Sequence, residues 1–275
     1  EEEKKVRLDL TNELIVTIDG KDAKDLDDAI SLYIKDDQYH LGVHIADVSH
    51  YVKEDSIVDQ EAYRRSTSAY LADRVIPMLP HLLSNDWCSL NPNETKLTLS
   101  CNMILDMDGK VVSYDIQKSY LESHRRLNYD EVNQFLIKGV SLKDQKVEAM
   151  LTMMSELSQK LKVIRKKRGE IEFESSELGF IVDKQGRVLD VYERKTDEAE
   201  ELIESFMLIA NETVAFHMHH AELPALYRIH EKPDNLKLKN ALTMVSRLGF
   251  PVNMKQLGSP KPLQVLTQNT ANTPY

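Results

Sequence analysis

Five aspartates lie within fourteen residues near the start of the chain, in the stretch TIDGKDAKDLDDAI at positions 17–30. Four of them, Asp19, Asp25, Asp27 and Asp28, follow an apolar run at intervals of six, two and one positions. Like charges at this density repel one another, so the arrangement costs stability unless a positive charge offsets it. Carboxylate oxygens are ligands that Mg²⁺ prefers, and two such ions can clamp the attacking and leaving oxygens of a phosphodiester. The spacing therefore suggests a magnesium site that handles phosphates.

A calcium loop, a solvated loop and a transferase motif compete with the magnesium site. An EF-hand calcium loop is excluded, because its sixth position must be Gly and its twelfth Glu. Counted from Asp19, those positions hold Lys24 and Ile30. A solvated loop with capping aspartates stays open on spacing alone, although the preceding apolar run favours the metal site. The DxD motif Asp25-Leu26-Asp27 also occurs in metal-dependent transferases, and by itself it is a weak signal.

The elements that must position the cluster follow from periodicity and turn signals. Residues 14–18 are expected to form a strand that delivers the aspartates at its C-terminal end. Asp108-Gly109 between two alternating runs predicts a hairpin over 97–122, and Gly186 marks a second over 180–193. A further strand is expected over 38–52, and helices over 55–74, 128–138, 143–168, 196–220 and 234–249. Without internal repeats or a low-complexity linker, we expect one α+β domain, a mixed sheet with hairpins surrounded by helices.

Composition narrows the function classes. The 275 residues carry a formal net charge of −10, which disfavours broad, non-specific nucleic-acid binding but leaves room for a local basic groove. No apolar run reaches the roughly 18 residues needed to cross a bilayer, so we expect no membrane partner. Cys88 and Cys101 fit no metal or redox spacing, and we expect both to be reduced and buried in a cytoplasmic protein.

Two further charged groups have simple explanations. The basic run at 165–168 is expected to be a solvated helix end, with a role at an RNA entrance as the alternative. His217, His219 and His220 lie at a predicted helix C-terminus, where cations are favoured, and we expect no metal there.

Six segments, in order, resemble the RNB catalytic domain of the ribonuclease II and ribonuclease R exoribonucleases, and the R type more closely. They lie at 17–29, 44–49 (HIADVS), 75–92, 126–129 (RLNY), 202–211 (LIESFMLIAN) and 226–231 (LYRIHE). The resemblance covers essentially the whole chain. It implies an exoribonuclease that hydrolyses single-stranded RNA from its 3′ end to 5′-nucleoside monophosphates, using Mg²⁺ or, as a substitute, Mn²⁺.

The resemblance also assigns roles to the aspartates. The four metal-site aspartates of the family fall on Asp19, Asp25, Asp27 and Asp28. Asp27 takes the most sensitive role, and Asp19 and Asp28 are the firmer ligands of the first ion. Asp25 and Asp27 count as catalytic. Asp22 lies outside the pattern and is expected to be a solvated loop residue.

The aromatic residues implied to contact RNA are Tyr70, Phe173 and Tyr129. Tyr70 and Phe173 would stack on bases near the 3′ end, a contact worth about 1–3 kcal/mol per base that tolerates any sequence. Tyr129 would contact the terminal nucleotide and counts among the catalytic residues. From the residues alone, each of the three could instead be a core aromatic.

Three polar residues complete the implied RNA site. Glu204 occupies a position near the RNA ribose, with Glu201 as a competitor. Arg228 and His230 could meet the RNA backbone, since Arg pairs well with phosphate. A structural role is an equally good explanation for His230.

The resemblance also sets domain expectations. We expect residues 1–12 to be a lead from a preceding module and 13–275 to be the N-terminal and central part of an RNB domain, incomplete at its C-terminus. A later arginine-containing segment of the family is not matched, so we expect weak or no activity from these residues alone. The family also leads us to expect a monomer. A non-catalytic RNA-binding relative is the alternative function, and the four intact aspartates disfavour it.

Overall fold

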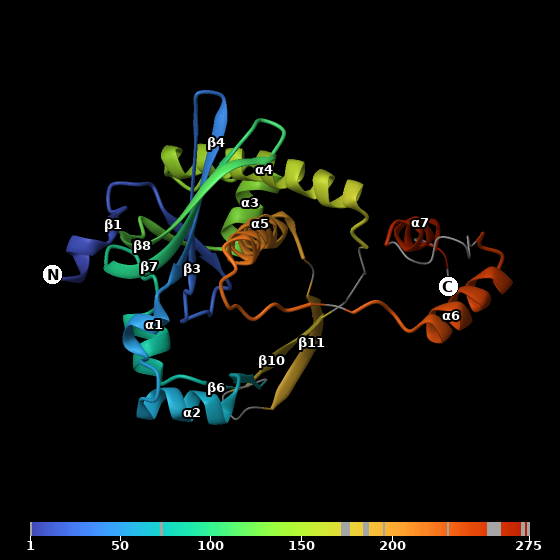
Figure 1. Ribbon diagram of the computed structural model, residues 1–275, viewed down its shortest axis with the longest axis horizontal. Helices are drawn as coiled ribbons and strands as arrows, with labels where there is room; N and C mark the ends of the chain where they lie inside the picture. Colours follow the sequence, from blue (N-terminus) through green and yellow to red (C-terminus); the bar gives the residue numbers. More distant parts are fainter. Residues whose placement is uncertain are drawn as a thin grey trace.

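The computed structural model describes residues 2–71, 74–171, 177–183, 187–194, 196–229, 231–251, 260–270 and 273. The strands of its main sheet are β1 (Leu8–Asp9), β2 (Val16–Asp19), β3 (Asp28–Lys35), β4 (Gln38–Ala46), β7 (Thr95–Leu105), β8 (Val111–Glu122) and β9 (Arg125–Asn128). They are ordered β1-β8-β7-β4-β3-β2-β9 (Figure 1). Two short ribbons, β5 (Ala69–Tyr70) with β6 (Val75–Ile76) and β10 (Glu177–Val182) with β11 (Val188–Arg194), stand apart from this sheet.

The helices are of very different lengths. Their bounds are η1 (Glu3–Val6), α1 (Val48–Tyr51), α2 (Ile57–Arg65), the π-helix η2 (Leu83–Trp87), α3 (Tyr129–Lys138), α4 (Gln145–Arg168), α5 (Glu198–His220), α6 (Asn235–Arg247) and α7 (Lys261–Thr270). Among the described residues no helix is both long and apolar enough to cross a bilayer. The mixed sheet with packed helices confirms the predicted α+β class.

Two parallel pairings make the sheet mixed. β1 runs parallel to β8, and β2 runs parallel to β9. The other neighbours, from β8 through β7, β4 and β3 to β2, pair antiparallel. The β2–β9 pairing matters most for function, because it sets Asp19 opposite Asn128, the residue before α3.

Helices α3, α4 and α5 lie together against the sheet (Figure 1). The core between them contains Val43, Met103 and Leu127 from the strands and Met150, Leu157 and Phe206 from the helices. A second, smaller core contains Ile15, Leu26, Leu90 and Leu121. The aspartate-bearing loop thus has one residue, Leu26, anchored in a core.

Local sequence explains where the main helices begin. Asn128 and Glu131 form a reciprocal capping box at the start of α3, and Asp197 and Glu200 form one at the start of α5. At the tip of the β7–β8 hairpin, Gly109 takes a φ of 87°, which residues with a side chain adopt only at a cost. The predicted hairpin over 97–122 and the predicted helix over 196–220 are confirmed to within two residues at each end.

Two elements are shorter than expected. The strand predicted over 38–52 ends at Ala46, because Asp47 caps the short helix α1 with its side chain. The helix predicted over 55–74, whose end was expected to pass into a loop, ends at Arg65, where Ser66 turns the backbone to a φ of 65°. The second predicted hairpin is formed by β10 and β11, but its turn at Gly186 lies outside the described residues.

Candidate active site

The aspartates gather where two neighbouring strands meet the loop that joins them. β2 ends at Asp19 and β3 begins at Asp28, and the two strands pair antiparallel with Val16 opposite Ile30. The ends of such a pair lie at the same edge of the sheet, so Asp19 and Asp28 are brought together. Asp25 and Asp27 belong to the connecting loop. The strand predicted to deliver the cluster is therefore present, shifted from 14–18 to 16–19.

The electrostatics show that the four carboxylates act on one another. Burial, followed by the charge of Asp28, raises the pKa of Asp19 from 3.8 to about 7, and Asp27 and Asp25 add smaller contributions. Burial, followed by the charge of Asp27, raises the pKa of Asp28 to about 6. The pKa of Asp27 is also raised, first by desolvation and then by Asp25. Asp27 is nevertheless the exposed member of the cluster, whereas the other three aspartates are partly buried.

Two buried carboxylate oxygens lie at this edge. Asp19 Oδ2 and Asp28 Oδ2 accept no hydrogen bond from the part of the chain that the structure describes. A buried, unpaired carboxylate oxygen is unfavourable, and a hard divalent cation would satisfy it. As the side chains stand, no three His, Cys, Asp or Glu residues of the described part are arranged to hold a metal ion together. The unsatisfied oxygens fit a cation, and the full ligand set predicted from sequence stays a prediction.

A positively charged side chain, that of Arg126, lies beside the aspartate loop. The Nη2 atom of Arg126 donates to the carbonyl oxygens of Lys21 and Ala23, at 3.1 and 2.6 Å. Its charge opposes the rise in the pKa of Asp19. Arg126 therefore fixes the first half of the loop and partly offsets the repulsion of the cluster.

Tyr70 lies beside the cluster, as its predicted role requires. Its hydroxyl donates to Asp25 Oδ2 over 3.4 Å, and 69% of the residue is exposed. The charge of Asp25, followed by desolvation, raises the pKa of the Tyr70 hydroxyl. The ring is thus tethered at its hydroxyl end and open to solvent, which excludes the alternative of a core aromatic.

Tyr129 is the first residue of α3 and follows Asn128, which pairs with Asp19 across the parallel strands. It is partly buried and packs against the larger core. The strand pairing therefore brings Tyr129 to the same edge of the sheet as the aspartates, although part of its ring serves the core.

The structure separates the two acidic residues that competed for the ribose position. Both carboxylate oxygens of Glu201 accept hydrogen bonds from Lys162 Nζ at 2.8 Å, which links α5 to α4. Glu204, one turn further along α5, is exposed. Glu201 has a structural partner, so Glu204 is the better placed of the two to meet a ligand.

The remaining predicted RNA contacts are Arg228, Phe173 and His230. Arg228 is exposed in the segment after α5, and no described hydrogen bond or ion pair connects it to the aspartates. Phe173 and His230 lie outside the described residues. Their predicted roles remain predictions.

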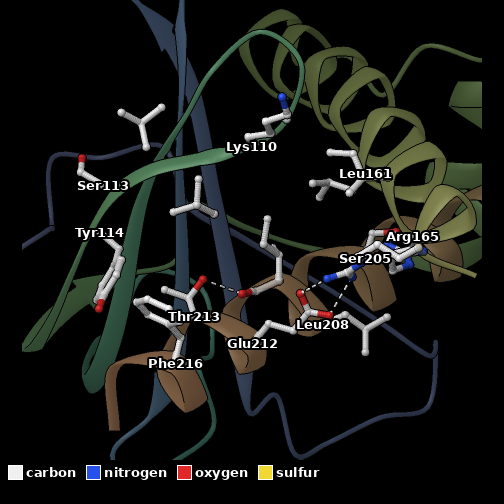
Figure 2. A pocket seen from close by; sticks show the side chains of 16 residues that line it. Lys110, Ser113, Tyr114, Leu161, Arg165, Ser205, Leu208, Glu212, Thr213 and Phe216 are labelled. Atoms are coloured by element: carbon white, nitrogen blue, oxygen red, sulfur yellow. Dashed lines mark hydrogen bonds and ion pairs between the residues drawn. The ribbon is translucent and has the colours of Figure 1, made fainter. Parts of the chain in front are cut away.

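A cavity of about 720 Å³ lies away from the aspartates, between the β7–β8 hairpin and helices α4 and α5 (Figure 2). Arg168 donates to both carboxylate oxygens of Glu212 at one end of it, at 3.0 and 2.9 Å. Arg165 donates to Glu170 at 2.9 Å and to Ser205 at 3.2 Å. The two arginines of the basic run are therefore paired within the fold.

Two histidines at the end of α5 contact aromatic side chains, and both cysteines lie inside the fold. His217 lies 3.4 Å from the Tyr114 hydroxyl, and the His220 ring lies 3.8 Å from the ring of Phe216, measured between centroids. Cys88 and Cys101 are both buried, as predicted, and neither forms a disulfide with a described residue.

Sequence reasoning missed two residues that shape the site. Arg126 and Ser89, which both bond to the loop backbone, stand out in the sequence only as members of matching segments. Their positions, 103 and 63 residues from the loop residues they contact, explain why spacing gives no signal.

Comparison with known proteins identifies the family of this chain. A family model described as the RNB domain matches residues 7–273. Ribonuclease R of Thermotoga maritima is 46% identical over 98% of this chain and 38% of its own length. Mycoplasma genitalium RNase R, solved in complex with double-stranded RNA, superposes with a TM-score of 0.94 at 32% identity, over 98% of this chain and 49% of that one. The chain thus spans less than half the length of these relatives.

The fold alone does not decide activity. Yeast Ssd1, a pseudonuclease, shares the fold with a TM-score of 0.79 at 18% identity, over 99% of this chain and 33% of that one. Function must therefore be argued from the site residues. What the family model and the relatives establish together with the fold is that this chain belongs to the RNB domain family.

Proposed function

We propose that these residues form the metal-binding part of a 3′→5′ exoribonuclease, which hydrolyses single-stranded RNA to 5′-nucleoside monophosphates with Mg²⁺. The observation that carries the proposal is the pair of buried, unpaired oxygens, Asp19 Oδ2 and Asp28 Oδ2, at one edge of the sheet. Relatives named Ribonuclease R, and solved RNase R structures that contain single- or double-stranded RNA, support RNA as the substrate class.

In this proposal Asp19 and Asp28 hold the cation, and Asp25 and Asp27 complete its surroundings. A bound divalent ion would stabilise negative charge on phosphate oxygens and make an attacking water more acidic. Mg²⁺ suits an all-oxygen donor set, and Mn²⁺ would substitute for it. Asp27, the exposed member, is the carboxylate that can face an RNA phosphate.

The chain's other residues would bind and orient the RNA. The exposed ring of Tyr70 supplies a stacking surface next to Asp25, and Tyr129 lies at the same edge of the sheet. Glu204 is open to a ribose hydroxyl, and Arg228 to a phosphate. Phe173 and His230 keep their proposed roles in stacking and backbone contact. We further propose that the protein acts as a monomer in the cytoplasm, where its two free cysteines stay reduced.

The first test is a titration of this chain with Mg²⁺ and with Mn²⁺ by calorimetry. We expect binding that is lost in the Asp27→Asn, Asp28→Asn double variant and kept in Asp22→Asn, an exposed control in the same loop. Binding that survives the double substitution would contradict the assigned site.

The second test follows the RNA. A 5′-labelled single-stranded RNA is incubated with an excess of the protein, and products are resolved with and without Mg²⁺. Shortening from the 3′ end with release of 5′-monophosphates, absent in Asp27→Asn, would support the exonuclease. Because we expect these residues alone to be weakly active or inactive, the non-catalytic relative is favoured only if a longer protein that contains them, and that binds both RNA and metal, also leaves the RNA intact.

A further inference from the structure

Ser89 touches the aspartate loop from outside it. The residue is completely buried just after η2. Its Oγ accepts a hydrogen bond from the Leu26 amide at 3.1 Å and donates to the carbonyl oxygen of Lys24 at 3.1 Å, with Asn91 Oδ1 as a more distant acceptor at 3.4 Å. The next amide, that of Leu90, donates to the Leu26 carbonyl oxygen at 2.8 Å. Three hydrogen bonds thus hold the backbone on both sides of Asp25.

These bonds fix the backbone around Leu26, the residue between two of the aspartates. Leu26 is completely buried, whereas Asp25 and Asp27 on either side of it reach solvent. Fixing the backbone at Leu26 therefore keeps its side chain in the core and leaves the two carboxylates on the open side. The same stretch of backbone continues into the sheet, since the carbonyl oxygen of Asp27 accepts a hydrogen bond from the Ala46 amide at 2.9 Å.

Two neighbouring carboxylates would separate if the backbone between them could move, because like charges repel. A site that must present them together gains from a backbone fixed before the ligand arrives. A buried hydroxyl that bonds to both sides of one loop residue supplies such a restraint. Ser89 makes no described contact with a carboxylate, so its effect would be indirect.

We propose that Ser89 is a positioning residue, which holds the backbone between Asp25 and Asp27 so that both carboxylates face a divalent cation. The inference rests on the proposed function for the identity of the ligand. It adds a residue outside the aspartate cluster to the set on which metal affinity depends.

The test compares Ser89→Ala with Ser158→Ala. Ser158 is also buried and loses one hydrogen bond, to Ser205 Oγ at 3.2 Å, but it lies in α4 and does not contact the loop. The affinity for Mn²⁺ alone is measured by electron paramagnetic resonance, well below each variant's melting temperature. Supporting residues around a metal site typically change affinity by about 10–100-fold. We expect about tenfold weaker binding in Ser89→Ala and an affinity within about twofold of the unchanged protein in Ser158→Ala.

Hydrogen exchange provides a readout that needs no metal. The Ala46 amide does not touch Ser89, yet it is bonded to Asp27, so its exchange reports whether the loop backbone has been released. We expect faster exchange at Ala46 in Ser89→Ala and no change in Ser158→Ala. If the unchanged protein binds Mn²⁺, equal affinity in Ser89→Ala overturns the proposal. If the unchanged protein does not bind Mn²⁺, the proposed metal site fails instead, and unchanged exchange at Ala46 then overturns the role of Ser89.

Discussion

The Tyr70 hydroxyl donates to Asp25 Oδ2 over 3.4 Å, although the two residues are 45 positions apart in the chain. This contact places an exposed aromatic ring at the border of the aspartate cluster. One side chain can therefore contribute to RNA binding in two ways. Its hydroxyl bonds to the cluster, and its exposed ring is available to stack on a base.

Replacing Tyr70 should therefore affect RNA binding in two distinguishable ways. Tyr70→Ala removes a stacking surface worth about 1–3 kcal/mol per base, which corresponds to roughly 5- to 150-fold weaker binding. Tyr70→Phe keeps the ring, and we expect an affinity within about twofold of the unchanged protein. Fluorescence anisotropy with a labelled single-stranded oligonucleotide measures both. Tyr63→Ala is the control, since Tyr63 is an exposed tyrosine on α2, and a loss there equal to that in Tyr70→Ala would argue against a specific stacking role.

Metal-free stability should fall as pH rises through the acidic range. The folded state raises the pKa of Asp19 from 3.8 to about 7, so it holds a proton that the unfolded state has already lost. The free energy of unfolding therefore decreases between about pH 4 and pH 7. Above the pKa that Asp19 has in the folded state, it decreases no further on this account. Asp19→Asn should flatten this slope and stabilise the protein at pH 8 by on the order of 1 kcal/mol, discounted for solvent screening.

Urea unfolding in the presence of a chelator, at pH 5 and pH 8, checks this expectation. The exposed Asp22→Asn variant is the control. If the free energy of unfolding of Asp19→Asn changes with pH as steeply as that of the unchanged protein, Asp19 is not the carboxylate whose raised pKa lowers stability.

The buried pair Arg7–Asp47 should be a large contributor to the integrity of the fold. Arg7 Nη2 donates to Asp47 Oδ2 at 2.7 Å, and Arg7 Nη1 donates to the carbonyl oxygens of Thr98 and Ser119 at 3.3 and 3.4 Å. Removing one partner of a buried pair leaves an uncompensated charge and costs about 3–5 kcal/mol. We expect that loss for Arg7→Met by chemical denaturation.

Removal of both charges provides the matched comparison. The Arg7→Met, Asp47→Leu double variant should be less destabilised than Arg7→Met, because no buried charge is left alone. Glu3→Gln removes only the partly exposed partner of Arg7 and should destabilise the protein much less than Arg7→Met. A double variant less stable than Arg7→Met would refute the electrostatic explanation.

Gly42 should not tolerate a side chain. A Cβ atom there would lie 2.4 Å from Ser31 Oγ and 2.6 Å from His44 Nε2, and both residues are buried. Those two atoms are themselves hydrogen-bonded at 3.1 Å, and burial lowers the pKa of His44 to about 3, so the imidazole is neutral near pH 7. We expect Gly42→Ala to lower stability by about 1–3 kcal/mol, as overpacking does.

Thermal unfolding of Gly42→Ala beside Gly20→Ala tests the steric argument. A Cβ at Gly20 meets nothing within 4 Å, so that variant should unfold near the temperature of the unchanged protein. Equal melting temperatures for the two variants would show that the strands around Gly42 can move apart.

The sequence predicted the elements whose signals are local. The β7–β8 hairpin carries its turn in Asp108-Gly109, and α5 carries its capping residues and a continuous apolar stripe. The aspartates could be placed at the end of a strand for the same reason. Each of these features is encoded within about one element's length of chain.

The elements that were missed depend on distant parts of the chain or break a local rule. In β3, residues 29–32 are all buried, so the strand lacks the alternation that marks a half-exposed strand. β9 is a four-residue strand defined by its pairing with β2. Helix α7 was not among the predicted helices, and it begins at Lys261-Pro262, since proline is accepted in the first turn of a helix. Arg126 and Ser89 likewise contact the aspartate loop only through hydrogen bonds between residues far apart in the chain.

The parallel pairing of β2 with β9 also has a consequence for synthesis. The aspartate loop leaves the ribosome 103 residues before Arg126, which completes its backbone hydrogen bonds at Ala23. Until then the acidic segment of the nascent chain lacks the two hydrogen bonds from Arg126, and contacts between distant residues form slowly. Domains generally fold as units during synthesis, so we expect this edge of the sheet to form late, after the β3–β4–β7–β8 meander. A chain released before residue 125 would contain all four aspartates and still lack the strand that fixes them.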